Sequence, residues 1–339
     1  MVMRRAGRLL AGLLAAALIA AGLLAAAAAW WVLRPLPLAG PAVELSIEPG
    51  TSPREIARGW ATAGVQVSPL LLYEWFRWSG QATRIRAGSY QATPGMSAHG
   101  LLKMMVQGDE RLAVVRLIDG WTFRRWRQEL ARSPDLRPDT ATLSDAQIMA
   151  ALGQPGVAPE GRFFPDTYSF SKGSSDLDVM RRAHRAMQQR LAEAWAQRQA
   201  GLPLRSPDEA LILASIIEKE TGHEQDRGLV AGVFVNRLRI GMPLQTDPTV
   251  IYGLGDAFDG NLRRRDLQAD TPFNTYTRTG LPPTPIAMPG KASLLAAVKP
   301  ATTRALYFVA RGDGRSAFSE SLADHNRAVD RYQRGRASP

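Results

Sequence analysis

The 339-residue sequence contains no cysteine and only four histidines. Without a thiol it can have no disulfide framework, no cysteine-ligated metal and no thiolate nucleophile. The histidines, at positions 99, 184, 223 and 325, are far apart, and neither an HExxH pattern nor a Gly-x-Ser-x-Gly elbow is present. A GxGxxG loop is absent as well, because Gly253 and Gly255 are followed by Phe258 where the third glycine would stand. We therefore expect neither a metal nor another cofactor.

Lysine is also scarce: five of the 42 basic residues are lysine and the rest are arginine, which with 31 acidic residues gives a net charge of +11. A basic balance is one sign of a nucleic-acid partner. Here the basic residues are scattered along the chain and accompany no groove-reading motif. The excess of arginine over lysine in an alanine-rich chain is the kind of bias that the base composition of a genome produces. We therefore expect no nucleic-acid partner.

Charge is missing altogether from one long apolar run, residues 9–33. As a helix rising about 1.5 Å per residue, this run would extend about 37 Å, enough to cross a bilayer. Its flanks carry arginines before the run and a tryptophan pair at its end, as membrane spans do: Arg4, Arg5, Arg8, Trp30 and Trp31. The sequence predicts a cytoplasmic segment (1–8), one helix through the inner (cytoplasmic) membrane (9–33) and an extracytoplasmic, periplasmic remainder. A signal peptide cleaved near Ala25–Ala29 is the alternative.

Three similar turns follow within residues 42–135. They read Glu48-Pro49-Gly50-Thr51-Ser52, Thr93-Pro94-Gly95-Met96-Ser97 and, more loosely, Ile118-Asp119-Gly120-Trp121-Thr122. Each follows a stretch typical of a strand and precedes a helical pattern that its Ser or Thr can cap. Such strand-turn-helix units resemble the LysM-like modules that bind N-acetylglucosamine strands of cell walls. Region 42–135 is therefore predicted to be a small α+β module with a connecting segment.

An aromatic cluster in this module, Trp75, Phe76 and Trp78, has two interpretations. The rings could stack on sugars, or they could belong to the hydrophobic core beside Leu70–Leu72. Their close spacing next to three leucines favours the core.

Region 140–339 contains the strongest candidate for a catalytic group. Ser206-Pro207-Asp208-Glu209 predicts a helix that begins with a capping box and stays apolar on nearly all sides until Glu218 and Glu220. The small residues Ala214 and Ser215 share the face of Glu218 and leave the room that a substrate groove requires. Glu220 points about 200° away around the helix. Alternatively, the Glu-Lys-Glu triplet only makes the end of the helix soluble.

Sequence blocks in this region resemble one family, the endolytic murein transglycosylases (YceG- or MltG-like). The likeness covers about residues 160–330 and consists of Glu160-Gly161-Arg162-Phe163-Phe164-Pro165-Asp166-Thr167-Tyr168, Leu213-Ala214-Ser215-Ile216-Ile217-Glu218-Lys219-Glu220-Thr221, Val233-Phe234-Val235-Asn236-Arg237-Leu238, Leu244-Gln245-Thr246-Asp247-Pro248-Thr249-Val250-Ile251-Tyr252-Gly253, Phe273-Asn274-Thr275-Tyr276-Thr277, Gly280-Leu281-Pro282-Pro283 with Pro285-Ile286, and Asp324-His325-Asn326. Phe273 departs from the Tyr that is common in the family, and Thr284 and Met288 vary a Pro-rich loop.

The resemblance implies a lytic transglycosylase, a carbon–oxygen lyase. Such an enzyme cleaves the β-1,4 bond between N-acetylmuramic acid and N-acetylglucosamine within nascent glycan strands, leaves 1,6-anhydro-muramyl ends and terminates strand elongation. Glu218 matches the family's catalytic glutamate, and one carboxyl suffices as acid and then base. Peptidoglycan synthases (penicillin-binding proteins) are the implied protein partners, with peptidoglycan strands as the substrate.

The remaining candidates are expected to bind substrate. Gln245, Thr246, Asn274, Thr275 and Tyr276 can hydrogen-bond sugar hydroxyls and acetamido groups, Glu160 lies in a polar segment that could line the cleft, and Asp247 before a proline is expected to bind or to support the loop. Two other functions remain open. Glu218 with Asp247 could form a two-carboxylate hydrolase, or the chain could be a non-catalytic scaffold that binds peptidoglycan and docks wall synthases.

Overall fold

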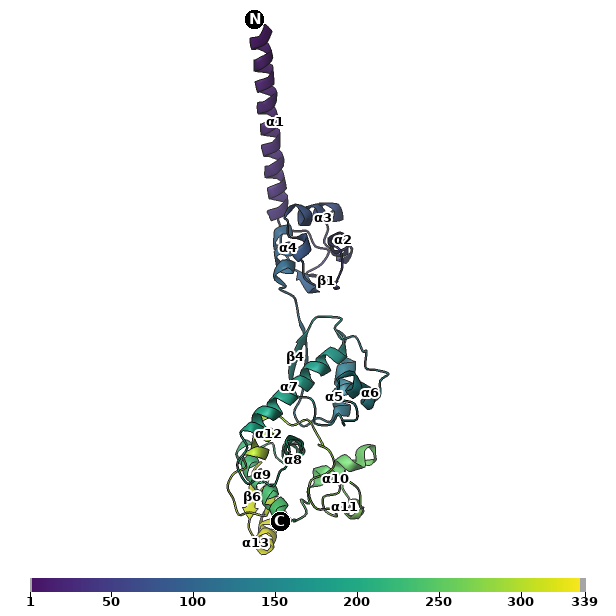
Figure 1. Ribbon diagram of the computed structural model, residues 1–339, viewed down its shortest axis with the longest axis vertical. Helices are drawn as coiled ribbons and strands as arrows, with labels where there is room; N and C mark the ends of the chain where they lie inside the picture. Colours follow the sequence, from purple (N-terminus) through teal and green to yellow (C-terminus); the bar gives the residue numbers. More distant parts are fainter. Residues whose placement is uncertain (1, 336–339) are drawn as a thin grey trace. The chain divides into compact units, whose positions relative to one another are not determined.

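The computed structural model describes residues 2–335 and contains two compact units (Figure 1). The first unit comprises the residues up to Ala113 together with Ser169–Gly173, and the second comprises Val114–Tyr168 and the residues from Ser174 on. Both units combine helices with short two-stranded sheets, which confirms the α+β class.

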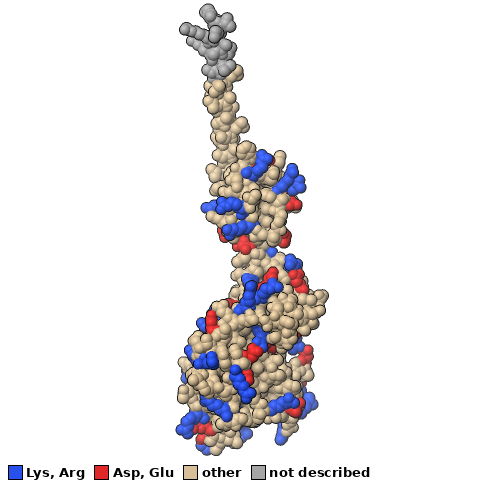
Figure 2. Space-filling model, in the orientation of Figure 1, with Lys and Arg blue, Asp and Glu red and all other residues tan. Residues whose placement is uncertain are grey.

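The elements of the first unit are α1 (Val2–Leu33), β1 (Val43–Ile47), α2 (Pro53–Ala63), α3 (Pro69–Trp78), the 3-10 helix η1 (Ala82–Arg84), β2 (Gly88–Ala92) and α4 (Ala98–Gln107). Among the described residues, Leu13–Leu33 is the one helical stretch long and apolar enough to cross a membrane. The described side chains of α1 carry no charge, as Figure 2 shows. An N-terminal apolar helix is thus present as predicted.

Local sequence signals explain how the module after α1 begins its helices. Ser52 and Glu55 form a reciprocal capping box at the start of α2, and the Ser97 side chain accepts the N–H of Gly100 at the start of α4. The strands β1 and β2 pair antiparallel, from Val43 opposite Ala92 to Ile47 opposite Gly88. The helices cover this two-stranded sheet around one hydrophobic core that contains the following fully buried residues: Trp60, Leu72, Phe76, Tyr90, Leu101 and Met105.

The three aromatic residues of α3 have different environments. Phe76 is completely buried, so the core interpretation is correct for it. Trp75 is half-buried, and its indole Nε1 donates a hydrogen bond to the carbonyl of Ala98 at 3.1 Å. Trp78 is 78% exposed, so it does not belong to the core. The sequence spacing alone did not separate these three environments.

The division between the units falls at residue 113, earlier than the expected change from the module to region 140–339. The reason is the packing of α5 (Phe123–Arg132). The Phe123 ring stacks on Phe163 with centroids 5.1 Å apart, and Trp126 contacts the same ring at 5.8 Å. The third turn, residues 118–122, and the helix after it therefore belong to the second unit.

The strands β3 (Ala113–Leu117) and β4 (Asp166–Phe170) begin or end at the division between the units. The other elements of the second unit are α6 (Asp145–Ala151), α7 (Asp176–Ala196), α8 (Pro207–Glu220), α9 (Glu224–Arg239), α10 (Asp247–Leu254), the 3-10 helix η2 (Gly255–Ala257), α11 (Arg264–Gln268), α12 (Lys291–Val298), β5 (Tyr307–Ala310), β6 (Ser316–Ser319), α13 (Leu322–Val329) and the π-helical turn η3 (Asp330–Arg334). β3 pairs with β4, and β5 pairs antiparallel with β6.

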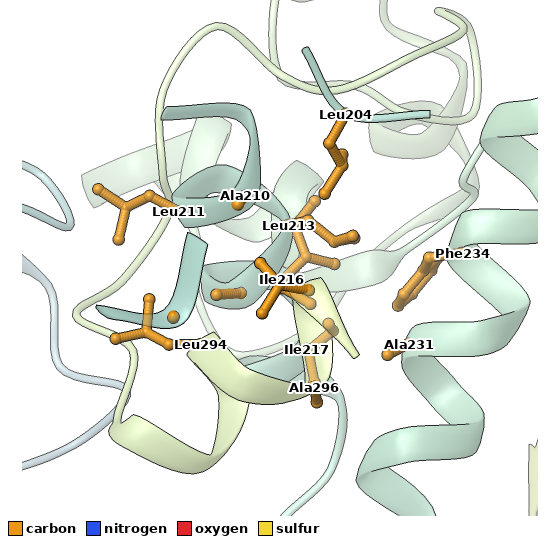
Figure 3. Packing of buried hydrophobic residues seen from close by; sticks show 14 of the residues in the cluster. Leu204, Ala210, Leu211, Leu213, Ile216, Ile217, Ala231, Phe234, Leu294 and Ala296 are labelled. Carbon is orange, nitrogen blue, oxygen red and sulfur yellow. The ribbon is translucent and has the colours of Figure 1, made fainter. Parts of the chain in front are cut away.

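Helix α8 lies at the centre of the second hydrophobic core (Figure 3). Its predicted apolar character is explained by burial on most sides, against α7, α9 and α12. Burying a Leu or Ile side chain stabilises a fold by about 1.5–3 kcal/mol, so this packing fixes the helix firmly. The N-terminal capping box is only half formed: the Ser206 hydroxyl accepts the N–H of Glu209, but the Glu209 carboxylate binds the N–H of Arg205 instead of Ser206.

Candidate active site

Glu218 lies in the last turns of the buried helix α8 and is itself half-buried. Its Oε2 atom accepts a hydrogen bond from the backbone N–H of Gly290 at 3.0 Å. Gly290 is buried and immediately precedes α12. The carboxyl is thus held at the junction of two helices that belong to the same core, which gives it a defined position.

A second carboxyl group, that of Asp119, lies against the same glycine. A Cβ atom on Gly290 would lie 2.6 Å from Oδ2 of Asp119, so the Asp119 carboxylate occupies the space that a side chain at position 290 would need. Partial burial raises the pKa of Asp119, and the nearby charge of Glu218 raises it further. Asp119 and Glu218 therefore form a pair of neighbouring acids.

Backbone contacts hold Asp119 in place. Gly120 donates its N–H to the carbonyl of Met288 at 2.8 Å, and Met288 donates its N–H to the carbonyl of Trp121 at 2.8 Å. Lys219, the residue after the candidate acid, donates from Nζ to the carbonyl of Gly120 at 3.3 Å. The third turn, the Pro-rich loop and the end of α8 are thus joined into one site.

Ser215 holds the Pro-rich loop against α8. Its hydroxyl accepts the N–H of Ile286 at 3.0 Å and donates to the carbonyl of Ile212 at 2.7 Å. The side chain is completely buried. The small residue expected to leave room beside Glu218 therefore has a further role, because it places the segment that leads to Gly290.

A cleft of about 630 Å³ opens beside this site. Its walls come from the start of α5, the segment before Glu160, helix α10 and the end of α8, and they include Phe123, Glu160, Lys219, Ile251, Tyr252 and Ile286. A second, smaller hollow of about 300 Å³ is lined by β3, Asp119 and the start of β4. Volumes of this size accommodate parts of a polymeric ligand.

Glu160 is the buried acid of the larger cleft. Both of its carboxyl oxygens accept the N–H of Phe123, at 3.1 and 3.2 Å, and the Tyr252 hydroxyl donates to Oε2 at 3.2 Å. Burial raises the pKa of Glu160 to about 7, although these hydrogen bonds favour the charged form. Near neutral pH this group therefore exists in both protonation states.

Glu220 points away from the Glu218 site, as its position on the helix predicted. Its Oε1 atom accepts a hydrogen bond from the hydroxyl of Thr246. Burial raises its pKa, and the charge of Asp247 adds to this effect. Asp247 in turn accepts a hydrogen bond from the Tyr276 hydroxyl at 2.5 Å. This second polar cluster connects α8 with the start of α10 and with the segment around Tyr276.

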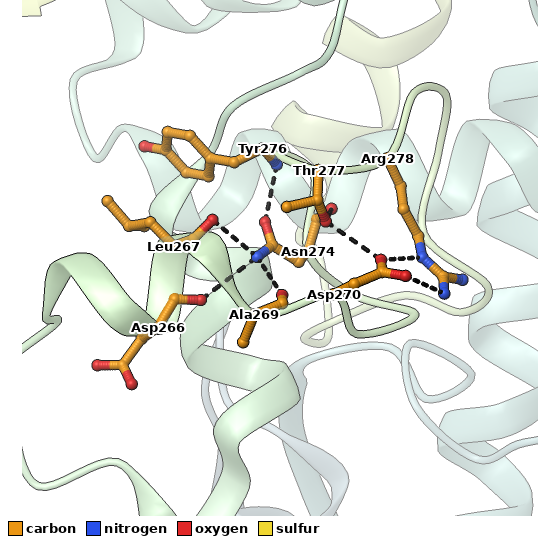
Figure 4. A network of polar contacts seen from close by, with 8 residues as sticks. All are labelled: Asp266, Leu267, Ala269, Asp270, Asn274, Tyr276, Thr277 and Arg278. Atoms are coloured by element: carbon orange, nitrogen blue, oxygen red, sulfur yellow. Dashed lines mark hydrogen bonds and ion pairs between the residues drawn. The ribbon is translucent and has the colours of Figure 1, made fainter.

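Three of the predicted binding residues are buried and hydrogen-bonded within the protein. The side-chain amide of Asn274 donates to the carbonyls of Asp266, Leu267 and Ala269 and accepts the N–H of Tyr276 (Figure 4). Thr275 and Thr246 are joined through the Thr275 hydroxyl, which accepts the N–H of Thr246 at 3.1 Å. These contacts favour a supporting role for Asn274, Thr275 and Thr246.

Gln245, Asp247 and Tyr276 keep exposed surface. Gln245 has a φ of 50°, a left-handed conformation that few residues other than glycine adopt, and its N–H donates to the carbonyl of Thr275 at 3.0 Å. The structure thus brings the 245–247 and 274–276 segments together. It places Glu160 in the cleft, and Glu218 beside Gly290 and Asp119.

Sequence reasoning missed Asp119, Gly290 and Tyr252. One signal for Asp119 was available: the first two turns have Pro49 and Pro94 at the position where the third has this aspartate. Aspartate is itself a common turn residue, so this difference alone does not identify a functional side chain.

Comparison with known proteins gives consistent matches. A model of the YceG-like family matches residues 45–331. An endolytic murein transglycosylase of Bacillus subtilis is 40% identical over 173 residues, which cover 51% of this chain and 48% of that protein. One from Streptococcus pneumoniae serotype 2 is 27% identical over 322 residues, covering 85% of this chain and 58% of that protein. The chain thus spans about half the length of these curated relatives.

A solved structure matches as well. The 2.6 Å crystal structure of a YceG-like protein from Listeria monocytogenes has a TM-score of 0.54 and 27% sequence identity to this chain. The match covers 85% of this chain and 98% of that one.

Proposed function

Since the chain belongs to the YceG-like family, we propose that it is an endolytic lytic transglycosylase that cuts glycan strands of peptidoglycan. Relatives that carry the name endolytic murein transglycosylase support this activity. The observation that carries the proposal within this chain is the position of Glu218, a carboxyl held by Gly290 at the end of a buried helix and beside a cleft.

Glu218 acts first as the general acid and then as the general base. In its protonated form it gives a proton to the glycosidic oxygen while the bond from this oxygen to C1 of N-acetylmuramic acid breaks. The resulting carboxylate removes the proton of the muramyl C6 hydroxyl, and O6 bonds to C1. The product carries a 1,6-anhydro end, Glu218 regains its proton and no water is consumed.

Asp119 supports this role as a positioning residue. Its carboxylate lies against Gly290, the residue whose N–H binds Glu218, so its packing helps to fix the loop that presents this N–H to the acid. Asp119 also changes the two-carboxylate alternative. The second carboxyl beside Glu218 is that of Asp119 and not that of Asp247. In a hydrolase it would activate a water molecule or attack the sugar.

The cleft and the second polar cluster provide the sugar-binding surface in this proposal. Glu160 and Tyr252 present polar groups inside the cleft. Gln245, Asp247 and Tyr276 contact sugar hydroxyls or acetamido groups directly. Thr246, Asn274 and Thr275, which are buried, hold the segments that present them.

We further propose that α1 anchors the chain in the inner membrane with its N-terminus in the cytoplasm, because the arginines before it favour the cytoplasmic side. The catalytic unit then faces the wall, where it ends the growth of nascent strands next to peptidoglycan synthases. The module of β1, β2 and α2 to α4 keeps the proposed LysM-like role of binding glycan or a partner.

Cleavage in heavy-oxygen water tests this proposal. Purified full-length protein in detergent is incubated with glycan strands in water enriched in oxygen-18, and the ends of the products are identified by mass spectrometry. We expect anhydro-muramyl ends without heavy oxygen. Reducing ends that contain heavy oxygen would identify a hydrolase instead, and intact strands would identify a non-catalytic scaffold.

A further inference from the structure

Helix α3 presents two apolar stripes instead of one. Leu72 and Phe76, four residues apart, are completely buried in the core of the first unit. Leu71, Trp75 and Trp78 form a second stripe at positions i, i+4 and i+7. Within the described structure this second stripe is partly open, since Leu71 is 49% and Trp78 is 78% exposed. A helix of a water-soluble domain has no need for the second stripe.

The second stripe faces the last turns of α1 across a cavity of about 670 Å³. The α1 side of this cavity consists of Ala28, Ala29, Trp31, Val32 and Leu33, and the α3 side consists of Leu71, Glu74, Trp75 and Trp78, with His99 from α4. The lining is apolar apart from His99 and Glu74, and the Glu74 carboxylate forms an ion pair with Arg77 at 3.1 Å. This lining is continuous with the uncharged surface of α1.

The position of α3 matches the boundary of a membrane. The segment directly after α1 pairs with the module. Leu36 donates its N–H to the carbonyl of Met96, and Pro35 forms an isolated antiparallel β-bridge with Ser97. Helix α3 runs across the end of α1 in Figure 1. Residues 28–33 of α1 extend over about 8 Å, and an interfacial helix buries its apolar face by about 5–10 Å.

The side chains at this boundary are those that occupy membrane interfaces. The Arg34 guanidinium lies over the Trp30 ring at 4.8 Å, and the Arg77 guanidinium lies over the Trp78 ring at 5.8 Å. Tryptophan is favoured at the level of lipid headgroups, and arginine can extend its charge toward their phosphates. Further basic side chains lie on the module next to α1 (Figure 2).

We propose that α3 lies in the headgroup region of the membrane that α1 crosses, with Leu71 and Trp78 inserted and a lipid acyl chain in the cavity between α3 and α1. The inference rests on α1 as the membrane span and is independent of the catalytic activity. The occupant is lipid, because the cavity continues the lipid-facing surface of α1 and has stacked Arg and Trp pairs at its level. Such an arrangement fixes the orientation of the module on the membrane surface.

The absence of cysteine makes a direct test possible. Single variants of the full-length chain, Leu71→Cys, Trp78→Cys, Ala21→Cys and Glu48→Cys, are labelled with a nitroxide and reconstituted in vesicles of phosphatidylethanolamine and phosphatidylglycerol. Power saturation measures the access of oxygen, which is concentrated in lipid, and of a water-soluble nickel chelate. We expect labels at positions 71 and 78 to be reached by oxygen and protected from nickel, the label at 21 to be deepest, and the label on the exposed turn residue Glu48 to be fully open to nickel.

Several results would overturn the proposal. Labels at 71 and 78 that are as open to nickel as the one at 48 would place α3 in water, even with Ala21→Cys in lipid. Protection from both reagents would mean contact with protein, such as a second transmembrane helix. A label at position 21 outside lipid would contradict the premise that α1 spans the membrane. As a further check, Leu71→Glu with Trp78→Glu should leave thermal unfolding unchanged, because both side chains are exposed. The same pair of changes should increase the access of nickel to a label at Leu70→Cys, an exposed neighbour on the same helix.

Discussion

The Oε2 atom of Glu218 accepts a hydrogen bond from the backbone N–H of Gly290 at 3.0 Å. This contact joins the end of α8 to the start of α12, and the Asp119 carboxylate lies against the same glycine. A backbone donor cannot be removed by mutation of its own side chain, so the support of the candidate acid is a property of the loop conformation.

The substitution Gly290→Ala tests the packing of Asp119. Gly290 has a φ of −79°, which alanine adopts without strain, so the expected effect comes from the added Cβ and the Asp119 carboxylate. The aspartate side chain can rotate toward solvent, and the free energy of unfolding should fall by less than about 1 kcal/mol. Cleavage should slow by about tenfold or more, because the neighbouring acids move.

A double-mutant cycle provides the control for this prediction. In a chain that already contains Asp119→Ala, the clash is absent, and Gly290→Ala should have little further effect on the cleavage rate. If Gly290→Ala slows cleavage by the same factor with and without Asp119→Ala, the two residues do not act through each other.

The substitutions Asp119→Asn and Asp119→Ala test whether the Asp119 side chain supports the site by its packing. The amide fills the same space against Gly290, whereas alanine leaves it empty, so Asp119→Ala should slow cleavage more than Asp119→Asn. The cleavage rate on glycan strands measures this effect, and the thermal midpoint checks the folding of each variant. Asp313→Asn, at an exposed loop residue between β5 and β6, is the control and should leave the rate unchanged. A wild-type rate for Asp119→Ala would separate Asp119 from the reaction.

Glu160 should make the stability of the fold depend on pH. Burial raises its pKa from 4.5 to about 7, so the folded chain holds a proton that the unfolded chain releases. Its contribution to stability is complete below about pH 4.5 and is lost as the pH rises to about 7, and this difference corresponds to about 3 kcal/mol. Glu160→Gln should flatten this dependence, measured as the thermal midpoint between pH 5 and 8. Glu224→Gln, at an exposed site, should follow the wild type, and an equal slope for Glu160→Gln would contradict the prediction.

Asn274 should contribute to stability rather than only to sugar binding. Its amide serves three backbone carbonyls, so Asn274→Ala leaves buried acceptors without donors and should reduce the free energy of unfolding by about 2–3 kcal/mol. The nearby exposed pair Asp270 and Arg278 offers a matched control, since Arg278→Ala should have little effect on stability. If the Asn274→Ala chain is as stable as the wild type but binds glycan more weakly, Asn274 contacts the sugar directly and the prediction is wrong.

The sequence predicted the local structure better than the arrangement of the site. Ser52 and Ser97 each cap a helix by binding an N–H three residues further along the chain. The apolar run of α1 and the buried pattern of α8 are continuous in sequence. These elements can therefore be identified from neighbouring residues. The position of α5 was less evident, because the stacking of Phe123 on Phe163 joins residues 40 positions apart.

The site itself depends on contacts between distant segments. Glu218 was identified as a candidate from its helix, but its partner Gly290 lies 72 residues further along the chain. The chemical type of Asn274 and Thr275 suggested sugar binding, while their burial depends on packing that no local pattern encodes. Asp119 was placed in a different region of the chain by its likeness to two earlier turns, and only the folded structure brings it to Glu218.

The most direct test of the central claim is the substitution Glu218→Gln, assayed on glycan strands with detection of anhydro-muramyl ends by mass spectrometry. The amide is nearly isosteric and can still accept the N–H of Gly290, so circular dichroism and the thermal midpoint should match those of the wild type. Because the amide cannot supply the proton, we predict that anhydro ends fall at least about a hundredfold, while Glu224→Gln retains wild-type cleavage. Anhydro ends formed by a folded Glu218→Gln chain at the wild-type rate would contradict the account.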